Sequence, residues 1–131
     1  MVHFEEANRI IQAAMAEATA ISQPMCVAVV DYGGNTIAFA RMDKAWIGSI
    51  DIAHKKAWTA RAFDISTKEL GENSQPGDQF YGIQESNDGR VMVFAGGLPL
   101  VADGEVVGAV GVSGGSGSQD QRVAEAGVAA F

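Results

Sequence analysis

Apolar side chains recur at intervals of three and four near the N-terminus. Residues 4–21, FEEANRIIQAAMAEATAI, place their apolar positions on one stripe and most charged positions elsewhere, which is the pattern of an amphipathic helix. Similar spacing predicts helices over 46–63 and 118–131. A shorter helix is predicted over 66–71, with Ser66 as its N-cap. The pattern therefore predicts helices near both ends and in the middle of the chain.

Short apolar runs between these segments predict strands. Residues 25–31 and 36–42 flank a Gly-Gly-Asn turn, which favours a β-hairpin because glycine and asparagine tolerate positive φ. Three further runs, 91–95, 98–101 and 106–112, follow a long polar stretch, and an Asp-Gly turn separates the last two. Glycines inside the last run indicate close approach of another backbone or helix. We expect about five antiparallel strands with helices packed on the sheet, an α+β fold.

Composition narrows the class of protein. The 131 residues fit one domain, 1–131, and a hydrophobic content of 47% is enough for one core. The formal net charge of −7 argues against nucleic acid as a partner. No apolar run approaches the roughly 18 residues that cross a membrane, and the N-terminus does not read as a secretory signal. We therefore expect a cytoplasmic protein with neither a nucleic-acid nor a membrane partner.

Charge is distributed unevenly along the chain. Residues 41–68 contain six basic and three acidic side chains, although the whole chain is acidic. A basic segment of this kind either attracts a small anion or forms a solvated helix face. Cys26, the only cysteine, lies in an apolar run, which favours a small buried side chain over a reactive thiol.

The predicted helix 46–63 carries the best candidates for ligand binding. One polar and aromatic face comprises Asp51, His54, Lys55, Trp58 and Arg61. His54 is the best donor for a haem iron, Asp51 is placed to orient its imidazole, and Trp58 can stack on a flat ligand. Lys55, Lys56 and Arg61 can pair with the carboxylates of such a ligand. The alternative is a surface histidine beside a packed tryptophan.

Arg41 and Asp43 form a second candidate group at the end of a predicted strand. They are two residues apart, so their side chains lie on the same side of the strand. Either they form a salt bridge that fixes the loop, or Arg41 holds a carboxylate while Asp43 acts as a general base.

The small residues before the last predicted helix form a third candidate. Free backbone N–H groups around Gly114, Gly115 and Ser116 can bind one carboxylate at a helix N-terminus. The alternative is a plain corner between strand and helix, with Ser118 and Gln121 forming a capping box. No residue spacing in the chain indicates a separate metal site.

Three stretches together resemble a known family. They are VVDYGGNTIAFARMDKAW (29–46), SIDIAHKKAWTARAF (49–63) and AGGLPLVADGEVVGAVGVSGGSGSQDQRVAEAG (95–127). In this order the chain resembles the GlcG/HbpS-like family and is similar to the C-terminal domain of PduO-type proteins. The resemblance implies a profilin- or roadblock-like α/β/α sandwich around a central antiparallel sheet, and it implies homo-oligomers. Some members of the family bind or degrade haem, and others are encoded in catabolic operons.

Two classes of function follow. The first is a small-ligand-binding protein that takes haem or another anionic tetrapyrrole as its cofactor, with His54 as the iron donor. The second is a metal-independent isomerase, tautomerase or hydrolase that acts on a small carboxylated intermediate of a catabolic pathway. Its acid–base groups would be Asp43, His54 or Lys56. Both classes predict a small anionic ligand, and the resemblance adds a second copy of the chain as a partner.

Overall fold

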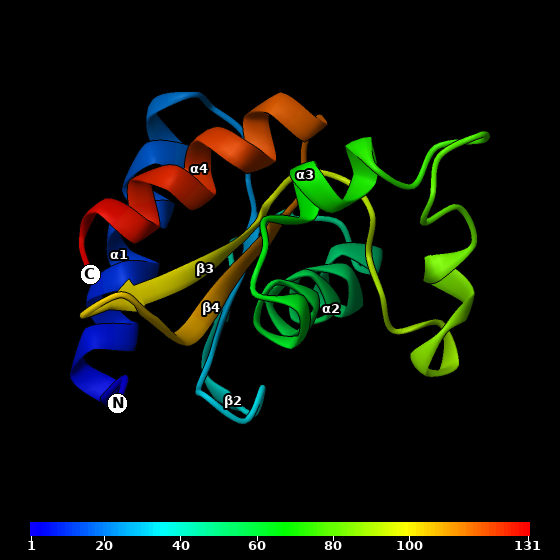
Figure 1. The fold of residues 1–131 in the computed structure, drawn as a ribbon. Coiled ribbons are helices and arrows are strands. Elements are labelled where there is room, and N and C mark those ends of the chain that lie inside the picture. Colours follow the sequence, from blue (N-terminus) through cyan, green and yellow to red (C-terminus); the bar gives the residue numbers. More distant parts are fainter.

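The computed structural model describes residues 1–131, which form three layers (Figure 1). In chain order the elements are α1 (Phe4–Ala20), β1 (Cys26–Val30), β2 (Thr36–Arg41), α2 (Gly48–Phe63), α3 (Thr67–Glu72), the 3-10 turns η1 (Ile83–Glu85) and η2 (Asn87–Gly89), β3 (Gly97–Ala102), β4 (Glu105–Ser113) and α4 (Gly117–Ala129). The helices α1 and α4 lie side by side on one face of the sheet, and α2 packs on the other (Figure 1). The predicted antiparallel sheet with helices on both faces is confirmed.

Four antiparallel strands form the sheet, in the order β2-β1-β4-β3. The hairpins β1–β2 and β3–β4 join through the pairing of β1 with β4, where Cys26 lies opposite Ser113. No helix is both long enough and apolar enough to span a membrane.

Both hairpin turns follow from their residues. In the first turn the carboxylate of Asp31 accepts hydrogen bonds from the backbone N–H groups of Gly33 and Asn35, each at 2.9 Å. In the second turn Asp103 and Gly104 adopt φ values of 52° and 79°, the left-handed conformation that a tight hairpin requires. Local sequence therefore specifies where these two strand pairs reverse.

The expectation of about five strands is wrong by one, because residues 91–95 form no strand. The hydroxyl of Thr59 on α2 accepts a hydrogen bond from Met92 N–H at 3.0 Å and lies 3.4 Å from the Arg90 carbonyl. The side chain of Val91 between them is buried. Because these backbone groups bond to α2, they do not extend the sheet, and the apolar run follows the helix instead.

The central strand β1 is buried on both faces of the sheet. Val27 and Val29 pack beneath α1 and α4, whereas Cys26, Ala28 and Val30 face α2, as the alternation of a strand requires. A strand covered by helices on both sides reads as a continuous apolar run, which is how the sequence identified it.

Glycines in β4 allow neighbouring segments to approach the strand closely. A Cβ atom on Gly111 would overlap the carbonyl of Ala53 on α2, and one on Gly108 would overlap the carbonyl of Val30 on β1. The neighbouring residues of α2 that face the sheet, Ala53 and Ala57, are also small. The close approach predicted from these two glycines is confirmed.

The last helix begins two residues earlier than the predicted capping box. Ser116 is the N-cap, its hydroxyl accepts from Gln119 N–H, and the Gln119 side chain accepts from Ser116 N–H. The pair Ser118 and Gln121 has the same spacing, but the side chain of Gln121 accepts a hydrogen bond from Gly96 N–H instead. The choice between two equivalent boxes therefore depends on a tertiary contact.

Candidate functional site

The largest hollow of the molecule lies where α2 faces the β1–β2 turn and η2. Its volume is about 490 Å³, within the range of roughly 300–1,000 Å³ that small-molecule sites occupy. The polar and aromatic side chains that line this cleft are Thr36, Asp51, His54, Lys55, Trp58, Asn87, Asp88 and Arg90. Four of the eight come from one face of α2, so helical spacing brings most of the predicted polar and aromatic face into one cleft.

His54 is held by two contacts that leave one ring nitrogen free. Its Nδ1 lies 2.8 Å from the carbonyl oxygen of Ile50. Because a carbonyl only accepts, Nδ1 donates and carries the proton of the neutral ring. The ring stacks on Phe39 of β2, with centroids 4.5 Å apart. Nε2 has no hydrogen-bond partner within the protein, so its lone pair is available to a metal.

The carboxylate predicted to orient the imidazole has a different partner. Asp51 forms an ion pair with Lys55 one turn later, with 3.0 Å between Oδ2 and Nζ. The Ile50 carbonyl takes the orienting role at His54. A backbone carbonyl serves as well as a carboxylate in fixing the tautomer of a ligating histidine.

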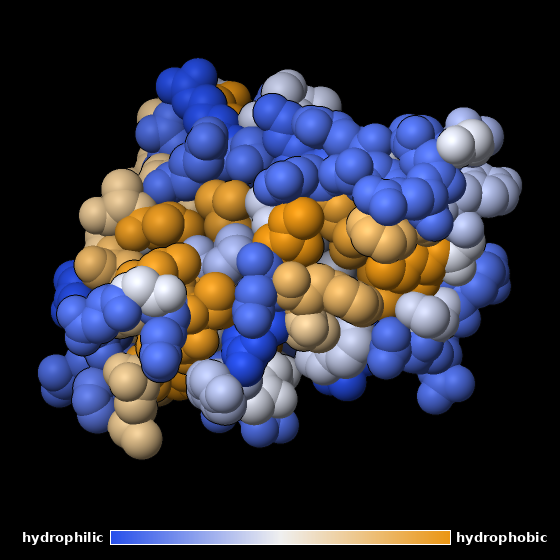
Figure 2. All heavy atoms as spheres, in the orientation of Figure 1, coloured by the Kyte–Doolittle hydropathy of each residue, from blue (hydrophilic) through white to orange (hydrophobic).

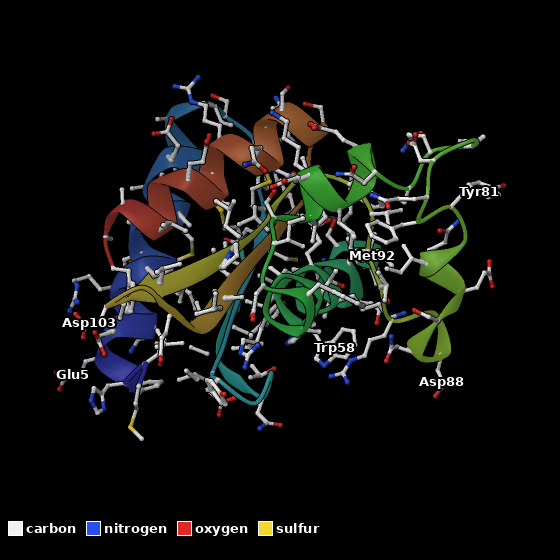
Figure 3. All side chains as sticks on the ribbon, in the orientation of Figure 1. Glu5, Trp58, Tyr81, Asp88, Met92 and Asp103 are labelled. Atoms are coloured by element: carbon white, nitrogen blue, oxygen red, sulfur yellow. The ribbon has the colours of Figure 1, made fainter.

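Trp58 lies between a glycine and an arginine. The guanidinium carbon of Arg90 lies 4.2 Å from the centroid of the Trp58 ring, in a cation–π contact. On the β1–β2 turn, a Cβ atom on Gly34 would come within 2.9 Å of Trp58 Cδ1. Figure 3 shows Trp58 beneath α2 and Asp88 pointing outward from the neighbouring loop. Sequence reasoning missed Arg90, whose one signal was its position at the end of the long polar stretch 72–89.

Lys56 lies away from the cleft, in the protein interior. Its Nζ donates to Asp120 Oδ2 at 2.8 Å and to the Val112 carbonyl at 2.9 Å, and the Phe94 ring covers it at 4.7 Å. Burial lowers the pKa of Lys56 and raises the pKa of Asp120, and the charge of each partner opposes these shifts. The helix therefore directs Lys56 and His54 to different places, and Lys56 does not line the cleft.

The glycine-rich turn before α4 already holds a carboxylate. Asp120 Oδ1 accepts a hydrogen bond from Gly115 N–H at 2.9 Å, and Gln119 Oε1 accepts one from Ser116 N–H at 2.9 Å. Gly114 is buried, close to Pro24 and Met25, which come directly before β1. The N–H groups predicted to bind an external anion thus have acceptors supplied by the chain itself, and this turn does not line the cleft.

Three more predicted residues lie outside the cleft. Arg41 donates from Nε and Nη2 to the carbonyl of Ala45, at 3.2 and 3.0 Å, rather than to Asp43. Asp43 is exposed on the loop after β2. Arg61 stacks on Tyr32, with 4.3 Å from Cζ to the ring centroid, beside a separate hollow of about 340 Å³. Of the residues predicted from the sequence, the structure brings together only Asp51, His54, Lys55 and Trp58 in this cleft.

Comparison with known proteins identifies the family. The family described as "Haem degrading protein HbpS-like" matches residues 2–129. A Citrobacter freundii protein, described as an uncharacterized 15.0 kDa protein in the dhaT-dhaS intergenic region, is 44% identical over 125 residues. The match covers 95% of this chain and 88% of that protein.

Solved structures agree with the sequence comparison. The Klebsiella pneumoniae protein ORFY is 40% identical with a TM-score of 0.97, covering 99% of this chain and 90% of its own. The PduOC:haem complex is 37% identical with a TM-score of 0.95, covering 98% of this chain and 94% of its own. These matches confirm the resemblance found in the sequence motifs. The chain belongs to the HbpS-like family.

Proposed function

We propose that the chain binds haem in the cleft beside α2, with Nε2 of His54 as an axial ligand of the iron. The observation that carries this proposal is the orientation of the imidazole. Nδ1 donates to the Ile50 carbonyl and Phe39 supports the ring face, so Nε2 is the free donor atom. Bound haem would supply an iron centre whose reactivity depends on this axial donor.

The donor set suits haem better than a bare metal ion. The structure contains no group of three or more histidine, cysteine, aspartate or glutamate side chains arranged to hold a metal. A porphyrin supplies most of the ligands of its iron, so one well-oriented histidine is enough. Trp58 adds a flat apolar surface to the same cleft, and Lys55 and Arg90 add positive charge.

Relatives support haem over the acid–base alternative. The PduOC:haem complex is a haem-bound protein of nearly the same fold. In contrast, Asp43 and Lys56 do not line the cleft that contains His54, so no shared site favours an isomerase, tautomerase or hydrolase.

Exposed apolar side chains support the expectation that copies of the chain associate. Figure 2 shows apolar residues gathered in a band across one face of the molecule. The large apolar side chains exposed on the protein as a whole are Met1, Phe4, Tyr32, Trp46, Ile47, Phe63, Phe80, Tyr81, Phe94 and Val101. Surfaces of this kind are typical of protein–protein contacts.

A haemin titration of the purified protein tests the axial ligand. We expect the wild type to shift the Soret band and His54→Phe to lose the shift, because phenylalanine keeps an aromatic ring on Phe39 but has no donor nitrogen. His3→Phe is the matched control, since His3 is exposed at the start of α1, and it should behave like the wild type. Circular dichroism verifies that both variants fold. An unshifted Soret band with stoichiometric haemin and wild-type protein would overturn the proposal.

A further inference from the structure

We infer that Arg90, supported by Trp58, is the carboxylate-recognition residue of the cleft, and that the ligand class is a planar aromatic molecule carrying free carboxylates. The inference deepens the proposed function, because the propionates of haem are carboxylates of this kind. It does not depend on ligation of iron by His54.

The backbone around Arg90 is fixed to α2, although it lies in the long stretch between α3 and β3 that contains only two 3-10 turns. The Thr59 hydroxyl lies 3.4 Å from the Arg90 carbonyl and accepts from Met92 N–H at 3.0 Å. The next side chain, Val91, is buried. These contacts hold the start of the Arg90 side chain at the rim of the cleft.

The guanidinium of Arg90 is the lining cation without an anionic partner. No carboxylate lies within ion-pair distance of it and its side chain makes no hydrogen bond within the protein, whereas Lys55 is paired with Asp51. The contact places the Arg90 guanidinium over the Trp58 ring, and an aromatic ring face does not use up the N–H groups as hydrogen-bond donors. Arginine in this arrangement can grip a carboxylate with two parallel hydrogen bonds.

Trp58 makes the position of the guanidinium specific. The indole is confined by the backbone of Gly34 on one side, where a larger residue would collide with it. Arg90 stacks on this confined ring rather than moving freely in solvent. A planar ligand entering the cleft thus meets an aromatic ring, a free imidazole nitrogen and an oriented guanidinium within one hollow.

Fluorescence of Trp58 provides a test that does not require iron. The chain has two tryptophans, so Trp46→Phe leaves Trp58 as the only one. The probes are metal-free protoporphyrin IX and its dimethyl ester, which differ only in free carboxylates. We expect the diacid to quench Trp58 with an affinity about tenfold above that of the diester, the scale of one charge-assisted hydrogen bond. Arg90→Gln should remove that preference, so that the diacid and the diester bind with equal affinity.

Arg122→Gln is the matched control, because it removes the same charge from exposed α4 on the other face of the sheet. It should keep the preference for the diacid. Equal affinities for diacid and diester, or a preference that survives Arg90→Gln, would overturn the inference even if haemin gives the Soret shift. An Arg90-dependent preference without a Soret shift would support the inference and reject ligation by His54. Absence of quenching by either probe would reject the inference, whatever the Soret band shows for haemin.

Discussion

Lys56 and Asp120 form an ion pair inside the protein, with 2.8 Å between Nζ and Oδ2. The pair joins the middle of α2 to the first turn of α4, and the Val112 carbonyl of β4 accepts a second hydrogen bond from Nζ. The other carboxylate oxygen of Asp120 accepts from Gly115 N–H in the turn before α4. Helices from opposite faces of the sheet are therefore linked through one buried polar network.

Removing one partner of this pair should strongly destabilise the fold. Lys56→Met leaves the Asp120 carboxylate buried without its counter-charge, and Asp120→Asn leaves the ammonium in the same state. Each should lower the free energy of unfolding by about 3–5 kcal/mol. The double variant should lose clearly less than the two single losses combined, because no unpaired charge remains. Urea denaturation of all four proteins completes the cycle, and additive losses would contradict the coupling.

Gly111→Ala should destabilise the contact between β4 and α2. The new methyl group would overlap the Ala53 carbonyl, and strain of this kind costs about 1–3 kcal/mol or more. Gly48→Ala is the control, because a Cβ at that exposed position meets no atom within 4 Å. Thermal unfolding should show a lower midpoint for Gly111→Ala alone. Equal midpoints for both variants would mean that the helix can move away from the sheet without penalty.

Gly34→Ala should displace Trp58 and weaken ligand binding in the cleft. Gly34 and Gly104 both have a φ of 79°, so alanine meets the same backbone strain at each position. Only at Gly34 does the added atom also contact the indole, since Gly104 has open space around it. Quenching by protoporphyrin IX should weaken several-fold in Gly34→Ala but not in Gly104→Ala, on the scale of one lost aromatic contact. A similar change in both variants would assign the effect to backbone strain.

Cys26 should make stability fall at alkaline pH. Burial raises the pKa of its thiol above the ordinary value of 9.0, although Arg41 opposes the shift. The unfolded chain releases this proton near pH 9.0, while the folded chain keeps it to higher pH. The folded state therefore holds more protons in that window, and the free energy of unfolding decreases as pH rises through it. The difference between wild type and Cys26→Ala, measured by urea denaturation from neutral pH to about pH 10, should decline accordingly.

Light scattering should show a particle several times heavier than the 13.7 kDa chain. The reason is the number of large apolar side chains that the isolated chain leaves exposed. Salt should change the mass little, because burial of apolar surface rather than ion pairing holds such contacts. A single species at the mass of one chain would contradict self-association.

The parts of the fold with a periodic hydrophobic pattern could be predicted from the sequence. The stripe over 4–21 and the apolar run at 25–31 correspond to α1 and β1 within a few residues. The run 91–95 had the same apolar character, but it lies beside α2 as an irregular segment. The Thr59 hydroxyl of α2 hydrogen-bonds to the backbone there, at Met92 N–H and near the Arg90 carbonyl. A hydrophobic pattern indicates that a segment is buried, but it does not indicate whether that segment forms a strand or stays irregular.

The candidate site could be predicted from the sequence only for the residues that lie on one helix, α2. The spacing of His54, Lys55 and Trp58 placed them together, since helical geometry is local. Arg90 reaches Trp58 from a distant loop, and no local pattern predicts such a contact. Lys56 follows His54 by two residues, so helix geometry turns it about 200° away around the axis, but no local pattern predicts its partner Asp120.

The sequence by itself determined the helices, both hairpins, the close packing against the glycines of β4, and the family, because these depend on periodicity, turn residues and motif order. Tertiary structure alone decided that Asp120 is the anion in the glycine-rich turn, that Lys56 neutralises it, and that Arg90 completes the cleft. These pairings join residues far apart in the chain. They are selected because a buried charge must find a partner and an aromatic ring must be covered, and the folded backbone determines which partner is within reach.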